Sequence, residues 1–175
     1  MPYPFLRVPQ ITAIQDVRRW HAHSTSREQS LAEHSHQVAL IARYLAPDDT
    51  SAEDMLQLLD VALVHDAHET VYGDIPYPAK VLLEGEGILM DAHCRKRFWG
   101  GVDPYEYIPH HVLNILEVAD RLEAALYAQK YIPEIAGEAT AEAVRVAQEK
   151  LRPCGMIRAL LALGIKVTEV SCVLP

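Results

Sequence analysis

The segment MLQLLDVALVHDAHETVYGDIPYP, residues 55–78, changes character halfway along its length. Its first half repeats apolar residues at helical spacing, as expected for the buried side of a helix. Directly afterwards come five acid or imidazole groups: His65, Asp66, His68, Glu69 and Asp74. An ionised carboxylate left unpaired in a core costs on the order of several kcal/mol. We therefore expect the helix to lead into a site that compensates these groups.

The rest of the chain follows the same helical period, apart from a possible extended tail at IKVTEVSCVLP, residues 165–175. Thr50 and Glu53 have the spacing of a capping box, and the two prolines of GDIPYP predict a loop there. The predicted helical segments are residues 11–20, 30–45, 51–72, 79–98, 110–129, 133–152 and 156–163. The expected fold is all-α: one compact, bundle-like domain over residues 1–175, with about six to seven helices.

Composition narrows the range of functions. The net charge of −8 over 175 residues argues against a broad basic surface that grips a nucleic-acid polymer. The start of the chain lacks an apolar signal-peptide core, and no run of 18 apolar residues occurs, so we expect neither secretion nor a membrane span. The three scattered cysteines form no C-x-x-C pair and favour inert thiols in a reducing cytoplasm.

Polar groups fall on the apolar sides of three predicted helices. In segment 30–45, His34 occupies one position of an apolar stripe with alternating spacings of three and four residues. Asp66 and Glu69 continue the stripe of segment 51–72, with His65 beside it, and Asp120 borders the apolar side of segment 110–129. Three helices are thus expected to point an imidazole or a carboxylate inward.

Two imidazoles and two carboxylates make a mixed nitrogen and oxygen set suited to a divalent transition metal such as Mn, Fe, Co, Ni or Zn. A single histidine on an apolar stripe is more often a hydrogen-bonded core residue, and an adjacent His-Asp pair is weak by itself. The combination of three helices favours a metal. Lys80 is a candidate phosphate contact.

The order His34, His65-Asp66, Asp120 resembles the metal-binding signature of the HD-domain phosphohydrolases. Four short sequence segments resemble one branch of that family: RRW (18–20), AEHSHQVA (32–39), HDAHE (65–69) and GDIPYP (73–78). The branch holds bacterial 5′-deoxynucleotidases and compact phage enzymes that hydrolyse deoxynucleoside triphosphates, dATP in particular. The resemblance runs from Arg19 to about Ala125.

The resemblance implies a role for each matching residue. Glu69 would transfer protons around the attacking water, together with the catalytic metal ligand Asp66. Arg19 and Trp20 would orient the phosphate and the nucleoside. The implied metal ligands are His34, His65, Asp66 and Asp120. The implied substrate-binding residues are Arg19, Trp20, His34, Asp74, Ile75, Pro76 and Tyr77, with Lys80 added from its charge.

The function expected first is a triphosphohydrolase that converts a dNTP, best dATP, into deoxynucleoside and inorganic triphosphate. The alternative is a 5′-deoxynucleotidase that releases orthophosphate from a dNMP. More remote alternatives are a non-catalytic nucleotide sensor and a metal-binding bundle, which usually needs E-x-x-H on two helices. The expected partners are a deoxynucleotide and further copies of the chain, with neither nucleic-acid polymer nor membrane.

Overall fold

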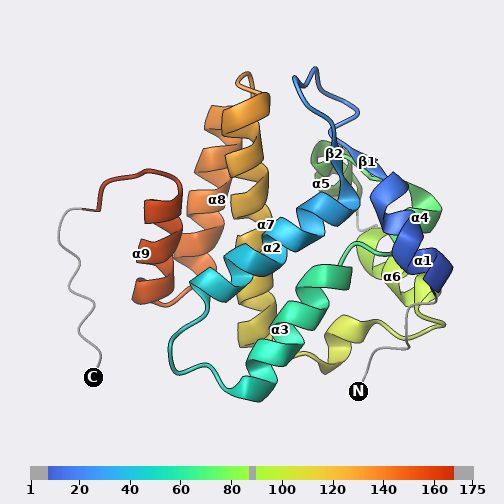
Figure 1. The fold of residues 1–175 in the computed structure, drawn as a ribbon, viewed down its shortest axis with the longest axis horizontal. Coiled ribbons are helices and arrows are strands. Elements are labelled where there is room, and N and C mark those ends of the chain that lie inside the picture. Colours follow the sequence, from blue (N-terminus) through green and yellow to red (C-terminus); the bar gives the residue numbers. More distant parts are fainter. Residues whose placement is uncertain (1–7, 87–89, 168–175) are drawn as a thin grey trace. The chain divides into compact units, whose positions relative to one another are not determined.

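The structure is a computed structural model that describes residues 8–86 and 90–167. Helices dominate it, and the two strands pair with each other (Figure 1). In chain order the elements are α1 (Val8–Ala13), η1 (Ile14–Asp16), β1 (Arg18–Arg19), β2 (Gln29–Ser30), α2 (Leu31–Leu45), α3 (Ala52–Val64), α4 (Glu69–Tyr72), α5 (Tyr77–Gly85), α6 (Met90–Phe98), η2 (Pro104–Tyr107), α7 (His110–Tyr131), α8 (Ala136–Lys150) and α9 (Pro153–Ala162). The expected all-α class is confirmed. There are more helices than expected because two predicted segments are each divided.

The described chain groups into two compact units. The first contains the residues up to Ser35 and Val64–Ile108, and the second contains His36–Leu63 and the residues from Pro109 onward. The described helices include none that is long and apolar enough to cross a membrane.

A small apolar core organises the first unit. It consists of buried residues from four different parts of the sequence, with partly buried apolar neighbours around them: Ile14, Leu31, Ala67 and Trp99, then Val17, Ala32, Val64 and Phe98. Val64 and Ala67 flank the His65-Asp66 pair in the sequence. Their burial in one core therefore anchors the backbone on both sides of that pair.

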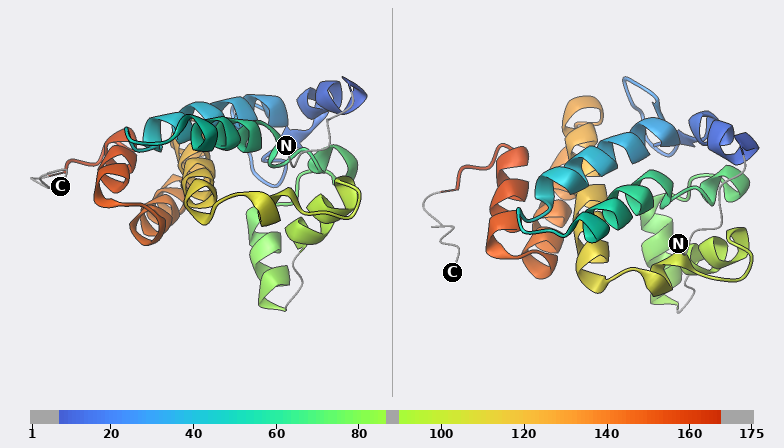
Figure 2. Two further views of the ribbon diagram at one scale, coloured as in Figure 1. Left: turned by 90° about the horizontal axis from the view of Figure 1, so that it is seen from below. Right: turned by 60° about the horizontal axis from the view of Figure 1, so that its bottom comes forward.

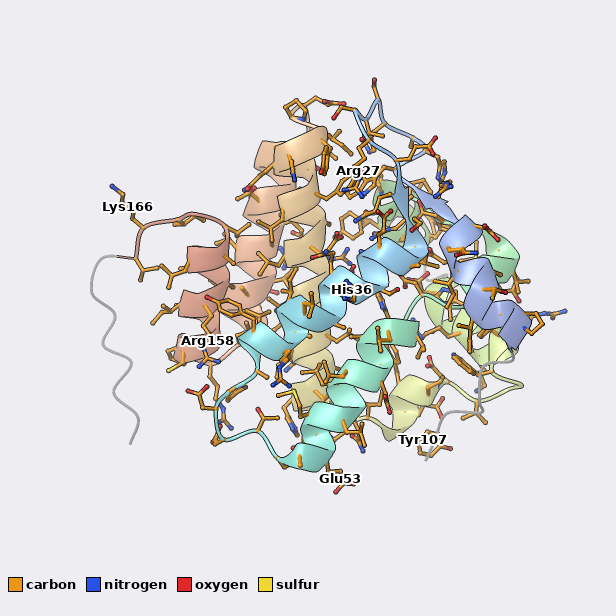
Figure 3. The ribbon with its side chains drawn as sticks, viewed as in Figure 1. Arg27, His36, Glu53, Tyr107, Arg158 and Lys166 are labelled. Carbon is orange, nitrogen blue, oxygen red and sulfur yellow. The ribbon has the colours of Figure 1, made fainter. Side chains whose placement is uncertain are left out.

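In the second unit, α7 and α8 lie side by side, as all the views show (Figures 1 and 2). Small residues such as Ala143 and Ala147 of α8 are buried, which permits close packing of the two helices. Arg158 of α9 satisfies carbonyl groups at the end of α2: its guanidinium donates to the Ala46 oxygen at 2.6 Å and to the Tyr44 oxygen at 3.3 Å (Figure 3). Such contacts supply partners that the last turn of a helix lacks.

The prediction of a helix over residues 11–20 is wrong in its second half. The helical part ends at Asp16, and Arg18–Arg19 instead form a strand antiparallel to Gln29–Ser30. The pairing closes the polar loop between them and supplies backbone hydrogen bonds that helical periodicity does not reveal. Of the candidate substrate residues, Arg19 therefore lies in a strand and Trp20 directly follows it, so neither belongs to a helix.

The segments 51–72 and 79–98 are not continuous helices. The first is interrupted between Val64 and Glu69, and in the second α5 ends at Gly85, a residue that disfavours helix. The start of α3 also differs by one residue from the prediction. The Asp54 amide donates to Ser51 Oγ at 3.0 Å, whereas the Thr50 hydroxyl donates to the Pro47 carbonyl oxygen. Ser51, not Thr50, caps this helix.

Two smaller expectations also change. Cys154 is disulfide-bonded, so the expectation of three inert thiols is wrong for that residue, whereas Cys94 is a buried free thiol. Most of the possible extended tail at 165–175 lies outside the described residues.

A capping box that helical periodicity does not predict starts α2. The Glu33 amide donates to Ser30 Oγ at 3.2 Å, and the Ser30 amide donates to Glu33 Oε2 at 2.9 Å. The backbone bond from Ser30 lowers the pKa of Glu33. Because the pKa falls on folding, the stabilisation is present above the unfolded pKa and is lost as pH drops through the folded pKa.

Ser30→Ala is expected to reduce the free energy of unfolding by about 1 kcal/mol, the usual cost of losing an N-cap. Urea unfolding at neutral pH measures the change. Ser26→Ala, an exposed loop serine, is the matched control and should change stability by less than about 0.5 kcal/mol. Equal effects of the two substitutions would contradict the capping role.

Candidate metal and active site

Three of the four expected metal ligands converge in the first unit. His34 Nε2 and His65 Nε2 are 3.3 Å apart, and Asp66 Oδ2 lies 3.1 Å from His65 Nε2 and 3.6 Å from His34 Nε2. His34 is fully buried and His65 is 6% exposed. One nitrogen or oxygen atom from each residue could contact the same ion.

A tight turn brings the neighbours His65 and Asp66 to the same point. After Val64 the backbone forms hydrogen bonds between residues three apart, such as Ala67 N to Val64 O at 3.0 Å and Glu69 N to Asp66 O at 2.9 Å. In a regular α-helix, adjacent side chains point about 100° apart. The tighter turn changes these directions, and the apolar anchors on both sides fix them.

The chemistry of the three residues fits a divalent cation. Burial raises the pKa of the Asp66 carboxyl, but the electrostatic attraction of His65 and hydrogen bonds from His34 and His65 hold that pKa well below its usual range. The carboxylate is therefore ionised, as a ligand must be. Two imidazole nitrogens facing each other at 3.3 Å can share only one proton between them, whereas a cation would accept the lone pairs of both.

Glu69 lies close to this group, at the start of α4. It is 2% exposed, and one of its carboxylate oxygens could share an ion with Asp66 and His68. Burial and repulsion from Asp66 raise the pKa of Glu69 to about 9. Its Oε1 accepts a hydrogen bond from Lys80 Nζ at 3.2 Å, while Oε2 has no hydrogen-bond partner among the described residues.

The segment around Trp20 is held in an unusual backbone conformation. Trp20 has φ of 65°, in the left-handed region that large side chains rarely adopt. Its indole Nε1 donates to the side chain of the buried Gln29 at 2.8 Å, and the Arg19 guanidinium lies 5.7 Å from the centre of the indole ring. The β1–β2 pairing positions both residues.

Residues 73–76 connect α4 to α5, and the prediction of a loop over all of GDIPYP is wrong for Tyr77 and Pro78, which form the first turn of α5. Asp74 Oδ2 lies 3.3 Å from His21 Nδ1, so this loop and the segment after Trp20 are in contact. Ile75 and Pro76 are partly buried, and Tyr77, which begins α5, is 42% exposed.

Asp120 and Lys80 are the remaining expected site residues. Asp120 lies on α7 in the second unit, where it is partly buried and 3.6 Å from Arg121 Nη1, and its role as a metal ligand stays a prediction. Lys80 contacts two carboxylates, Glu69 and Asp91, each at 3.2 Å, and its role as a phosphate contact also stays a prediction. Sequence reasoning missed Asp91, because its spacing from Lys80 belongs to no common motif.

The chain has relatives among nucleotide hydrolases. Residues 8–84 match the family model described as 5′-deoxynucleotidase YfbR-like. A dATP triphosphohydrolase of Salmonella phage PMBT28 is 35% identical over 83 residues, or 43% of either chain. A dATP triphosphohydrolase of Acinetobacter phage SH-Ab 15497 is 30% identical over 142 residues, which are 72% of this chain and 68% of that protein.

A solved structure shares the fold. The cyanophage S-2L HD phosphohydrolase DatZ, bound to dA and one catalytic Zn²⁺ ion, superposes with a TM-score of 0.72 at 19% identity, over 91% of this chain and 95% of that one. Together with the sequence matches, this likeness defines the class. The chain belongs to the HD-domain phosphohydrolases. Within them it falls in the branch of 5′-deoxynucleotidases and phage dATP triphosphohydrolases.

Proposed function

We propose that this protein is a metal-dependent hydrolase of 2′-deoxynucleotides whose preferred substrate is dATP. It would break the ester bond between the 5′ oxygen and the α-phosphorus, with water as the nucleophile, and release deoxyadenosine and inorganic triphosphate. The observation that carries the proposal is the convergence of His34, His65 and Asp66 beside a buried Glu69. The two phage dATP triphosphohydrolases support the choice of substrate.

We assign His34, His65 and Asp66 as metal ligands and Asp120 as the fourth. The donors suit Zn, Mn, Fe, Co or Ni. When bound, such a cation supplies a Lewis acid that lowers the pKa of water and offsets charge on phosphate oxygens. The protein keeps the Asp66 carboxylate ionised and shields both imidazoles from solvent, which holds the ligand set ready for the ion.

Glu69 is assigned to proton transfer. With a pKa raised to about 9, its carboxylate is a stronger base than that of an exposed glutamate, and it can therefore take a proton from the attacking water. The oxygen that does not bond Lys80 is suited to this contact. Charge from a cation held by the neighbouring ligands would lower the pKa toward neutrality, where proton transfer in both directions is efficient.

The remaining site residues are assigned to the substrate. The planar guanidinium of Arg19 suits a phosphate, and the Trp20 ring offers a flat surface for the nucleoside. Asp74, Ile75 and Pro76 of the loop after α4, together with Tyr77 at the start of α5, are assigned to the sugar and base. The contact of His21 with Asp74 links this loop to the Trp20 segment, so that both can close on one ligand.

The second candidate is a 5′-deoxynucleotidase acting on a dNMP, which the YfbR-like description of residues 8–84 favours. The ester bond broken is the same, so the metal site serves both reactions. The metal-binding bundle gains no support. The sequence contains one E-x-x-H motif, formed by Glu33 and His36. Glu33 caps α2, and His36 is exposed on that helix (Figure 3).

Identification of the released anion separates the candidates. Protein loaded with Co²⁺, Mn²⁺ or Zn²⁺ is incubated with dATP, dAMP or ATP, and the anions are resolved by ion-exchange chromatography. We expect triphosphate from dATP and much slower hydrolysis of ATP. Orthophosphate from dAMP alone would establish the nucleotidase instead, and no hydrolysis with any metal would favour a sensor.

We also infer that residues 1–175 act as one functional domain, that the protein forms a homo-oligomer and that it works in the cytoplasm. The phage relatives support the location, and the apolar residues of α9 support the assembly. Equilibrium sedimentation of the purified protein tests the oligomer, and a monomeric mass would contradict it.

A further inference from the structure

We propose that Asp91 is a positioning residue that acts on Glu69 through Lys80, and that these three residues and His68 form a network that determines the rate of hydrolysis. The inference rests on the hydrolase function proposed above. All four residues belong to the first unit, yet they come from three separate helices and the turn before α4.

The chain of contacts is continuous. Lys80 Nζ, from α5, lies 3.2 Å from Glu69 Oε1 and 3.2 Å from Asp91 Oδ2, so one ammonium group bridges two carboxylates. The other Asp91 oxygen, Oδ1, lies 3.7 Å from Nε2 of His68. His68 is 1% exposed and Glu69 is 2% exposed, so the chain runs from a buried imidazole to a buried carboxylate.

The arrangement fixes a flexible group. A lysine ammonium sits on a four-carbon stem and tends to extend toward solvent. Here the Lys80 side chain is only 19% exposed and is attached at two points. Because α5 and α6 both contribute to the bridge, a loss of Asp91 would remove the contact that holds the ammonium from the side of α6.

The charge of Asp91 also supports a role in positioning Lys80. Burial raises the pKa of Asp91, but the His68 contact and the charge of Lys80 lower it below its usual value, so Asp91 is an anion. An anion on the far side of Lys80 offsets part of the positive charge that Glu69 experiences. Asp91 thereby fixes both the place of the ammonium and how strongly it attracts the Glu69 carboxylate.

Asp91→Asn is the first test, because it removes the charge and keeps the shape. In the metal-loaded protein we expect kcat for dATP to fall about tenfold, a typical loss when a residue behind a catalytic group is changed. KM should stay within about twofold, since the substrate is not contacted. Asp91→Glu, which restores the charge, should recover part of the loss and also serves if the asparagine variant fails to fold.

Asp103→Asn is the matched control. Asp103 is also a buried carboxylate of the first unit, and its carboxylate bonds Arg95 at 3.0 and 3.2 Å and the Tyr105 amide at 3.1 Å rather than Lys80. It should lower the unfolding midpoint and leave kcat unchanged. Metal content by mass spectrometry should be the same in all variants, because no ligand is altered.

Two further readouts separate positioning from general damage. In the Glu69→Gln background, Asp91→Asn should lower kcat by less than about twofold, because its target is already gone. In NMR spectra of the lysine side chains, the Lys80 ammonium signal, assigned with Lys80→Met, should be visible in the wild type and lost by rapid exchange in Asp91→Asn.

Several outcomes would overturn the inference: an unchanged kcat in Asp91→Asn, an equal loss in the Glu69→Gln background, or an unaltered Lys80 signal. A large rise in KM would instead place Lys80 on the substrate phosphates. If the wild type hydrolyses no deoxynucleotide, the proposed function fails, and the Lys80 signal alone still tests the bridge.

Discussion

Asp66→Ala is expected to abolish both metal retention and dATP hydrolysis. Asp66 is the ionised member of the ligand group, and its Oδ2 lies within 3.6 Å of both imidazole nitrogens. Without it, the assigned ligands are His34, His65 and Asp120, a set one carboxylate short that binds a divalent cation more weakly. A catalytic metal contributes several kcal/mol to the transition state, so turnover should fall by about 10³-fold or more.

The measurement combines metal content after gel filtration with the initial rate at saturating dATP. Asp60→Ala, an exposed carboxylate on α3, is the control and should retain both metal and rate. Excess metal in the assay should rescue Asp66→Ala only partly. A variant that keeps one equivalent of metal and full activity would remove Asp66 from the site.

Much of the fold can be predicted from the sequence where packing follows a regular period. The α2 stripe is an example: Leu31, His34, Val38 and Leu45 are all buried. The long helix α7 begins after Pro109 as expected, and Glu123 on its apolar side is buried. In α2 a single face is covered, so the period of the hydrophobic residues contains the needed information.

The interruptions could not be predicted in this way. Asp66 and Glu69 continue the helical spacing of α3 and so predict an uninterrupted helix, and only the packing of Val64 and Ala67 in the core of the first unit favours the tighter hydrogen bonding. The strand at Arg18–Arg19 likewise depends on a partner ten or more residues away. Local periodicity does not register either kind of contact.

Some residues of the candidate site could be predicted from the sequence, and others could not. His34, His65 and Asp66 could be grouped from sequence because a shared inward direction and a family resemblance pointed to them. The supporting residues could not: Gln29 holds the Trp20 indole, His21 contacts Asp74, and Asp91 contacts Lys80. These contacts join segments whose separation follows no motif, and they are visible only in three dimensions.

Glu69→Gln is expected to keep the metal and lose most of the rate. Glutamine preserves the size of the side chain and can still accept a hydrogen bond from Lys80, but it cannot take a proton from water. Removal of a general base typically costs about 10²–10⁴-fold in kcat. Because the three converging ligands are untouched, metal content should equal that of the wild type, in contrast to Asp66→Ala.

The comparison needs a glutamate whose loss is silent. Glu53→Gln serves, since Glu53 is exposed in the first turn of α3 (Figure 3). If Glu69→Gln also loses its metal, Glu69 is a ligand and not a base, and the proton must pass to another group. If the rate survives with the metal in place, the water is activated without Glu69, and the inference about Asp91 loses its target. Retained metal with a kcat lowered about 10²-fold or more is the one result that supports both assignments.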